Sequence, residues 1–123
     1  MPNSSHTIVL IVEDDPLVLL AAVDMIEDAG FGVLQANSAD AAILLLEEHS
    51  DIHIVFTDIE MPGSMNGVKL AACIRDRWPP IEIIATSGRL VADDISLPLR
   101  SVFLPKPYRA QELMGQVTAM ARS

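Results

Sequence analysis

The hydrophobic residues of this chain fall into short continuous runs, separated by longer stretches in which they recur every three or four positions. The first run, Thr7 to Val12 (TIVLIV), is rich in β-branched residues and is typical of a strand buried on both faces. Comparable runs predict further strands at residues 32–36, 52–57, 81–85 and 102–104. Each run ends in polar or turn-forming residues, so five separate strands are expected.

The stretches between these runs have the periodicity of amphipathic helices. Asp15 and Pro16 suit the N-cap and the first position of the earliest one. The predicted helices occupy residues 16–29, a stretch capped by Asn37 or Ser38, a stretch from Asn66-Gly67 to the residues before Pro79, and residues 110–122. Between the last two strands there is room only for a short helix at 90–96, because Pro98 limits it. The fourth helix of the alternation is therefore expected to be short or irregular.

Strands and helices alternate along the whole chain, which predicts an α/β fold with a parallel sheet between two helical layers. The length of 123 residues suits a single domain with a substantial core. Hydrophobic residues make up 50 % of the chain and charged residues 20 %, a balance typical of globular proteins.

The net charge of −9 argues against nucleic acid as a direct partner, because a phosphate backbone requires a basic surface. The single Cys73 has no internal disulfide partner, which fits a reducing compartment. The N-terminus lacks the basic segment of a signal peptide, and the longest apolar run, Leu17 to Val23, is too short to span a membrane. A cytoplasmic domain without membrane contact is therefore expected.

Polar side chains follow the predicted strands at positions that would meet on one edge of the sheet. The ligand edge of such a sheet lies at the carboxyl ends of its strands. The residues at these ends are Glu13, Asp14, Asp15, Asp58, Thr86, Ser87 and Lys106. Crowded carboxylates repel each other unless a cation joins them, and an all-oxygen site without His or Cys suits Mg²⁺. A lysine and a hydroxyl beside them would complete a site for a phosphoryl group.

Taken singly, these residues have plainer explanations. Thr86 could be a strand-end hydroxyl bonded to the backbone, Lys106 a surface lysine, and Phe103 a core residue. Asp15, which follows the acidic pair, is better explained as a helix cap than as a metal ligand. The combination of residues, rather than any one of them, indicates a site.

Four short motifs occur in order, each at the end of a predicted strand: Glu13-Asp14, Asp58 with Met61-Pro62-Gly63, Thr86-Ser87-Gly88, and Pro105-Lys106-Pro107. In this combination the chain resembles the receiver domain of two-component response regulators, and the resemblance covers nearly its whole length. It implies a flavodoxin-like sandwich with a five-stranded parallel sheet in the order 2-1-3-4-5.

The resemblance also implies a role for each acidic residue. Asp58 corresponds to the phosphoacceptor, which takes a phosphoryl group from a histidine kinase, a histidine phosphotransfer protein or a small phosphodonor. Glu13 and Asp14 correspond to the acidic pair that holds Mg²⁺ together with Asp58. The backbone carbonyl of Glu60 would be a further ligand.

Three other residues receive switch or binding roles from the same resemblance. Thr86 corresponds to the switch hydroxyl and Lys106 to the phosphate-binding lysine. Phe103 falls at the aromatic switch position, and the peptide bond between Lys106 and Pro107 is expected to be cis.

The expected function is that of a stand-alone receiver domain spanning residues 1–123, with an ordered core of about 6–121 and no output domain. It would switch the binding of an unknown downstream protein or pass the phosphoryl group on, as a monomer or weak homodimer. One alternative is a phosphorylation-independent interaction module with the same fold. Another is a haloacid-dehalogenase-type phosphatase. That enzyme needs Asp two residues after its nucleophile, where Glu60 stands here, and the chain has no room for its cap domain.

Overall fold

The structure is a computed structural model, and it describes residues 7–63, 65–89 and 95–122. Within these ranges the chain forms five strands and four helices, which alternate except that β5 is the next described element after β4. The strands are β1 (Ile8–Val12), β2 (Gly32–Ala36), β3 (Ile52–Asp58), β4 (Glu82–Ser87) and β5 (Ser101–Pro105). The helices are α1 (Pro16–Asp28), α2 (Ala39–Glu48), α3 (Gly67–Arg77) and α4 (Ala110–Ala121).

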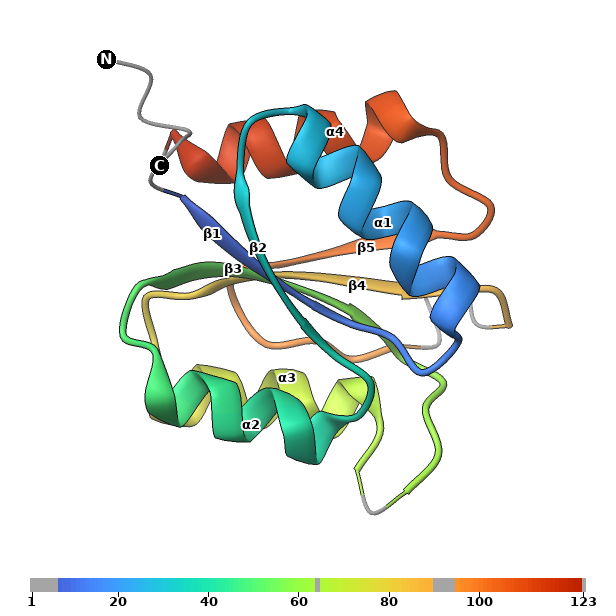
Figure 1. Cartoon of the computed structure of the whole chain (residues 1–123). Coiled ribbons are helices and arrows are strands. Elements are labelled where there is room, and N and C mark those ends of the chain that lie inside the picture. Colours follow the sequence, from blue (N-terminus) through green and yellow to red (C-terminus); the bar gives the residue numbers. More distant parts are fainter. Residues whose placement is uncertain (1–6, 64, 90–94, 123) are drawn as a thin grey trace.

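The strands form one parallel sheet in the order β2-β1-β3-β4-β5. Figure 1 shows α1 and α4 on one face of this sheet and α2 and α3 on the other. The predicted α/β class and strand order are therefore confirmed. The carboxyl ends of all five strands lie on one edge, as parallel pairing requires.

Short polar side chains begin three of the helices. Asp15 accepts hydrogen bonds from the backbone N–H groups of Leu17 and Val18 at the start of α1. Ser38, one of the two predicted candidates, caps α2, and Asn66 caps α3. Each cap satisfies backbone donors that have no partner inside the helix, and so fixes where the helix begins.

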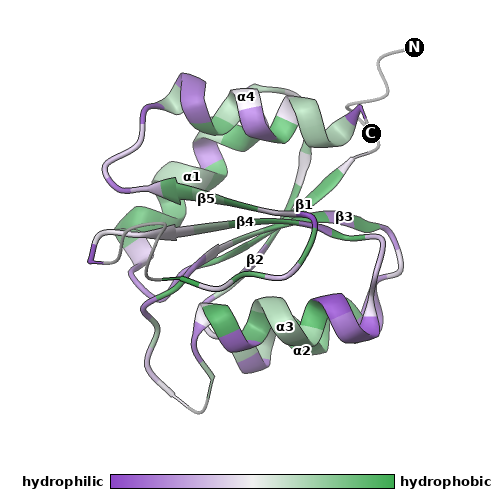
Figure 2. Cartoon of the chain, turned by 180° about the vertical axis from the view of Figure 1, so that it is seen from behind, coloured by the Kyte–Doolittle hydropathy of each residue, from purple (hydrophilic) through white to green (hydrophobic). Residues whose placement is uncertain are grey.

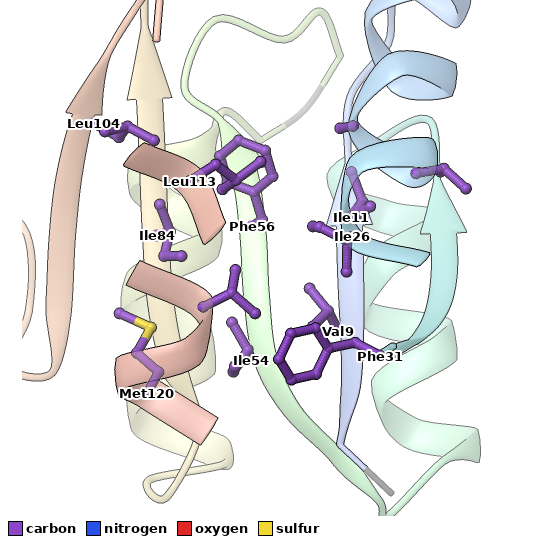
Figure 3. Close-up of a cluster of buried hydrophobic side chains, with 13 residues drawn as sticks. Val9, Ile11, Ile26, Phe31, Ile54, Phe56, Ile84, Leu104, Leu113 and Met120 are labelled. Carbon is purple, nitrogen blue, oxygen red and sulfur yellow. The ribbon is translucent and has the colours of Figure 1, made fainter. Parts of the chain in front are cut away.

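The central strands bury both of their faces, and two separate cores result. One core lies between the sheet and the pair α1 and α4, and Figure 3 shows its side chains interlocking across the strands. The other lies between the sheet and the pair α2 and α3. Figure 2 shows hydrophobic colour along the inner strands, with hydrophilic positions interspersed along the helices. This distribution is the expected result of parallel strands covered on both faces.

β3 contains one irregularity, at His53. Ile8 and Val9, which are neighbours on β1, pair with Ile52 and Ile54 on β3, so that one residue of β3 is extra. Ile52 belongs to the core under α2 and α3, whereas Ile54 belongs to the core under α1 and α4. Regular alternation would place both on the same face. The bulge therefore changes the face toward which the rest of β3 points.

The connection between β4 and β5 is held by Arg75, near the end of α3. Its guanidinium donates to the carbonyl oxygens of Leu99 (2.7 Å), Pro79 (2.6 Å), Ile81 (2.8 Å) and Arg100 (3.3 Å). Residues 95–100 form no helix. Residues 90–94, where most of the predicted short helix would lie, are outside the described residues. In the described part of this connection, side-chain hydrogen bonds from α3 take the place of helical ones.

Candidate functional site

The candidate site residues continue the rows of apolar side chains that face α1 and α4. In these rows Val9 and Ile11 lead to Glu13, and Ile54 and Phe56 lead to Asp58. On the neighbouring strands Ile84 leads to Thr86, and Leu104 leads to Lys106. Because side chains alternate between faces with a period of two, each polar residue emerges on the same side of the sheet. The fold thus converts four separate sequence motifs into one cluster.

Three carboxylates meet at the carboxyl edge. One oxygen from each of Glu13, Asp14 and Asp58 lies within 4.8 Å of the others. Glu13 is 5 % exposed and Asp58 is 6 % exposed, whereas Asp14 is open to solvent. A set of carboxylate oxygens that is open on one side fits a hard divalent cation and leaves room for water or substrate oxygens. Asp15 stays outside this set, since its carboxylate caps α1.

Lys106 brings a positive charge to two of these carboxylates. Its Nζ lies 3.3 Å from Asp58 Oδ2 and 3.5 Å from Glu13 Oε1. The Lys106 backbone N–H donates to the carbonyl oxygen of Ser87 at 3.0 Å, which fixes the end of β5 beside the end of β4. The Lys106–Pro107 peptide bond is cis. The amine therefore lies where it can pair with a negatively charged group bound at Asp58.

Backbone donors hold the two buried carboxylates in place. The N–H of Asp15 donates to Glu13 Oε2 at 3.1 Å, and the N–H of Glu60 donates to Asp58 Oδ1 at 3.3 Å. Asp58 therefore has Lys106 at one oxygen and the Glu60 backbone at the other. Both contacts orient the carboxylate and favour its ionised form, which is the form that can act as a nucleophile.

Burial is the main influence on the charge of this cluster. It raises the pKa of Asp58, and the charge of Glu60 adds to the increase, while Lys106 opposes it. Burial likewise raises the pKa of Glu13, with a further contribution from Asp58. For Lys106, burial alone would lower the pKa, but the Asp58 and Glu13 carboxylates outweigh it and the pKa is raised. Without a cation the cluster is thus electrostatically unfavourable, and binding of a cation would relieve it.

Thr86 lies beside the phosphoacceptor candidate. Its Cα is in register with that of Asp58 across the β3–β4 pair, and the residue is 2 % exposed. Among the described residues its hydroxyl oxygen has no hydrogen-bond partner. A small cavity borders Thr86, Asp58 and Glu13. A buried hydroxyl without a partner is costly, so its position next to the Asp58 carboxylate indicates a donor kept for a bound group.

Phe103 is the one predicted site residue that does not join the cluster. It lies on β5 with its Cα in register with that of Ala85, and it is half-buried. Its neighbour Leu104 faces the core under α1 and α4, so alternation places Phe103 on the opposite face. Phe103 is therefore two strands away from Asp58, with β4 between them, and on the other side of the sheet.

The sequence interpretation missed Tyr108 and, although it placed Ser87 at the end of a strand, did not predict the partner of Ser87. Tyr108 packs edge-on against Phe56, with ring centroids 5.7 Å apart, and borders the cavity next to Asp58. Its place directly after Lys106-Pro107 was the available signal. The hydroxyl of Ser87, at the end of β4, donates to Glu60 Oε2 in the loop after β3, a contact that no pattern in the sequence indicates.

Comparison with known proteins decides the family. The family model described as the response regulator receiver domain matches residues 9–118. The chain belongs to the response regulator receiver domain family. A receiver protein from Sinorhizobium medicae has a crystal structure similar to this receiver domain, with a TM-score of 0.86, 27 % identity and 95 % of both chains covered. The receiver domain of the hybrid histidine kinase CckA is also similar, with a TM-score of 0.80, 26 % identity, and 93 % of this chain and 98 % of that chain covered.

Among curated proteins, this receiver domain is 31 % identical over 121 residues to the sensor kinase CckA of Brucella abortus, covering 95 % of this chain and 13 % of that protein. It is 29 % identical over 118 residues to the heme response regulator HssR of Staphylococcus saprophyticus, covering 94 % of this chain and 52 % of that protein. The chain thus spans about half or less of the length of these relatives.

Family membership also bears on the alternatives. A receiver domain is a signalling phosphoacceptor and not a classical enzyme, so the phosphatase interpretation is set aside. The acidic cluster is typical of a receiver metal site, and a histidine kinase is the partner that such a domain implies. In the described ranges, no helix combines the length and hydrophobicity needed to cross a membrane.

Proposed function

We propose that this receiver domain accepts a phosphoryl group on the carboxylate of Asp58. The observation that carries the proposal is the convergence, around one buried carboxylate, of two acidic residues, a lysine amine and a hydroxyl that has no hydrogen-bond partner in the part of the chain that the structure describes. An Asp58 oxygen attacks phosphorus, a new O–P bond forms, and the bond from phosphorus to the donor breaks. The donor leaves with the electron pair of the broken bond, and acetate leaving from acetyl phosphate is stable as an anion without a proton.

The donor set of the cluster fits Mg²⁺, with the carboxylates of Glu13, Asp14 and Asp58 and the backbone carbonyl of Glu60 as the proposed ligands. When bound, Mg²⁺ neutralises negative charge on the phosphoryl oxygens. The protein contributes orientation, because the backbone donors of Asp15 and Glu60 hold two of the carboxylates. Removal of Mg²⁺ is expected to abolish phosphorylation.

Lys106 and Thr86 are proposed to bind the oxygens of the transferred group. The Lys106 amine already lies 3.3 Å from Asp58 Oδ2, and the Thr86 hydroxyl has a donor to offer. Movement of Thr86 toward the phosphoryl group would alter the end of β4. Phe103 lies on the opposite face of the neighbouring strand, so its proposed switch role would depend on a shift passed through the paired backbones of β4 and β5. The balance between inactive and active forms then shifts by as much as the phosphoryl group prefers one of them.

The proposed partners are a histidine kinase or a histidine phosphotransfer protein as the donor, and a downstream protein that distinguishes the two forms. The domain is proposed to act in the cytoplasm as a monomer or weak homodimer, without contacting nucleic acid. The net charge of −9 supports the last point, because it would repel a phosphate backbone.

The test is incubation with Mg²⁺ and acetyl phosphate, followed by intact-protein mass spectrometry. Wild type should gain one phosphoryl group, and the Asp58→Asn variant should gain none. An equal adduct on the Asp58→Asn variant, or no adduct on wild type, would contradict the proposal. Glu48→Gln is a matched control, because Glu48 is an exposed acidic residue at the end of α2, where the chain turns toward the opposite edge of the sheet.

A further inference from the structure

Thr57 places a hydroxyl on the face of β3 that points away from the acidic cluster. Val55, two residues earlier on the strand, belongs to the core under α2 and α3, so alternation puts Thr57 on that face as well. The residue is completely buried, with 0 % of its surface exposed. A valine would have nearly the same shape and would bring no polar group into the core. The hydroxyl therefore costs free energy unless it is hydrogen-bonded.

The partner of this hydroxyl is the backbone carbonyl oxygen of Asp58. Thr57 Oγ1 donates to that oxygen at a distance of 2.9 Å, and the contact is buried. The pairing of β1 with β3 ends at Val12 and Thr57, so Asp58 lies one residue beyond that ladder. Gly67, at the start of α3, lies over the same oxygen, with which a β-carbon at this position would collide. The hydroxyl thus satisfies a carbonyl group that has left the β1 ladder and is covered by α3.

The peptide unit between Asp58 and Ile59 is held at both of its polar ends. Thr57 binds its carbonyl oxygen, and the Ile59 N–H donates to the carbonyl oxygen of Thr86 on β4 at 2.9 Å. Because a peptide unit is planar, contacts at both of these ends oppose its rotation. The unit begins at the Cα of Asp58 and leads to Glu60, whose N–H donates to Asp58 Oδ1. Its orientation therefore fixes the backbone from which the carboxylate projects, together with one donor to that carboxylate.

We infer that Thr57 is a positioning residue whose hydroxyl fixes the Asp58 peptide unit and so holds the Asp58 carboxylate in the alignment needed for Mg²⁺ binding and phosphoryl transfer. The inference rests on the proposed function, because it concerns the same carboxylate. Thr57 acts through the backbone, since its side chain lies on the opposite face of the sheet. Such alignment matters because transfer requires the reacting atoms to be in line, and because outer contacts orient metal ligands.

Two substitutions separate the hydroxyl of Thr57 from its methyl group. Thr57→Val keeps the shape and removes the donor, whereas Thr57→Ser keeps the donor and removes a buried methyl group. At saturating Mg²⁺, the second-order rate constant for phosphorylation by acetyl phosphate should fall roughly three- to tenfold in Thr57→Val, as expected for the loss of one neutral hydrogen bond. In Thr57→Ser it should stay within about twofold of wild type, although the loss of the methyl group lowers the Tm.

Two measurements on the unphosphorylated protein report the same alignment. Mg²⁺ affinity, measured by calorimetry, should weaken roughly three- to tenfold in Thr57→Val and should be recovered in Thr57→Ser. Amide hydrogen exchange at Ile59 should become faster by about threefold or more in Thr57→Val, relative to exchange at Leu10 in the centre of β1. Leu10 reports the stability of the sheet as a whole, so the ratio separates a local change from general destabilisation.

Thr7→Val provides a matched control, because it makes the same chemical change at another buried threonine. Thr7 is 7 % exposed and lies directly before β1, at the edge of the sheet opposite to the acidic cluster. This variant should match wild type in the rate constant, in Mg²⁺ affinity and in the exchange ratio between Ile59 and Leu10.

The outcomes distinguish this inference from the proposed function. If wild type forms no adduct, the proposed function fails, and the calorimetric and exchange results alone decide whether Thr57 positions Asp58. If wild type is phosphorylated and Thr57→Val reacts at the wild-type rate, only the role of Thr57 is overturned. A loss in Thr57→Ser equal to that in Thr57→Val would also overturn it, because the methyl group would then be responsible. A slower Thr57→Val with an unchanged exchange ratio would show that the hydroxyl does not act through the peptide unit.

Discussion

Gly67 is a position at which the addition of a single methyl group should strongly destabilise the fold. It begins α3, is buried, and donates its N–H to the carbonyl oxygen of Ile59 at 3.0 Å. A β-carbon at this position would collide with the carbonyl oxygen of Asp58 and lie 2.7 Å from the Cα of Ile59. Both neighbours are backbone atoms at the end of β3, so no side-chain rotation relieves the clash. The Gly67→Ala substitution must move either α3 or the end of β3 that carries Asp58, the proposed phosphoacceptor.

The expected cost follows from the kind of neighbour. Extra methylenes in a packed interior usually cost about 1–3 kcal/mol. The contact with rigid backbone places Gly67→Ala at the upper end, about 3 kcal/mol. For a domain of this size, that loss corresponds to a decrease in Tm of roughly 10–15 °C. Displacement of Asp58 should also slow its phosphorylation by at least tenfold, because transfer depends on alignment of the reacting atoms.

Gly115 provides a matched control. It lies within α4 and is exposed, and a β-carbon there would meet no atom within 4 Å. Gly115→Ala should therefore stabilise the protein by about 0.5–1 kcal/mol through helix propensity alone. Urea and thermal denaturation of both variants, followed by circular dichroism, measure the difference. If Gly67→Ala lowers the free energy of unfolding by less than about 1 kcal/mol and accepts phosphoryl groups at the wild-type rate, the start of α3 does not pack against the end of β3 as described.

Further predictions concern the acidic cluster and the Arg75 contacts. Because the pKa values of Glu13 and Asp58 are raised in the fold, the native state binds more protons than the unfolded chain just above the ordinary carboxyl range. Without Mg²⁺, the free energy of unfolding should therefore fall as pH rises through that window, and the Asp58→Asn variant should show a shallower fall in urea titrations from pH 4 to 8. An identical slope in both proteins would contradict the assigned pKa direction. Above this window, Asp58→Asn should be more stable than wild type without Mg²⁺, and saturating Mg²⁺ should narrow or reverse the difference in Tm. Arg75→Met should cost about 2 kcal/mol by removing hydrogen bonds to four carbonyl groups, with faster amide exchange in residues 97–101. Arg75→Lys keeps the positive charge but not the planar guanidinium group, so it should recover less than half of the stability that Arg75→Met loses. Full recovery of that stability would show that the charge alone suffices.

Much of the fold was predictable because its signals are local and repeated. The β-branched runs marked the strands, and the caps Asp15 and Asn66 marked where two helices begin. Once the alternation was clear, parallel pairing placed every strand end on one edge. The convergence of Glu13, Asp58 and Lys106 followed from that geometry, together with the family resemblance.

Other features depend on contacts between distant segments, and the sequence carries no local sign of them. The Arg75 hydrogen bonds to residues 99 and 100 join α3 to a segment more than twenty positions away. The contact between Ser87 and Glu60 likewise forms only when β3 and β4 lie side by side. The placement of Phe103 on the opposite face from Thr86 was available from alternation along β5, but only after the faces of the sheet had been assigned.

The bulge at His53 has a consequence for which changes in chain length β3 can tolerate. From Ile54 onward every second residue points toward α1 and α4, and Asp58 is the last of that series. A deletion or insertion of one residue between Ile54 and Asp58 would turn the carboxylate away from Glu13 and Lys106. A single change in length before His53 can instead be absorbed by removing or enlarging the bulge. Length variation in functional relatives of this domain should therefore be found at the beginning of this strand and not in the four residues that precede the phosphoacceptor.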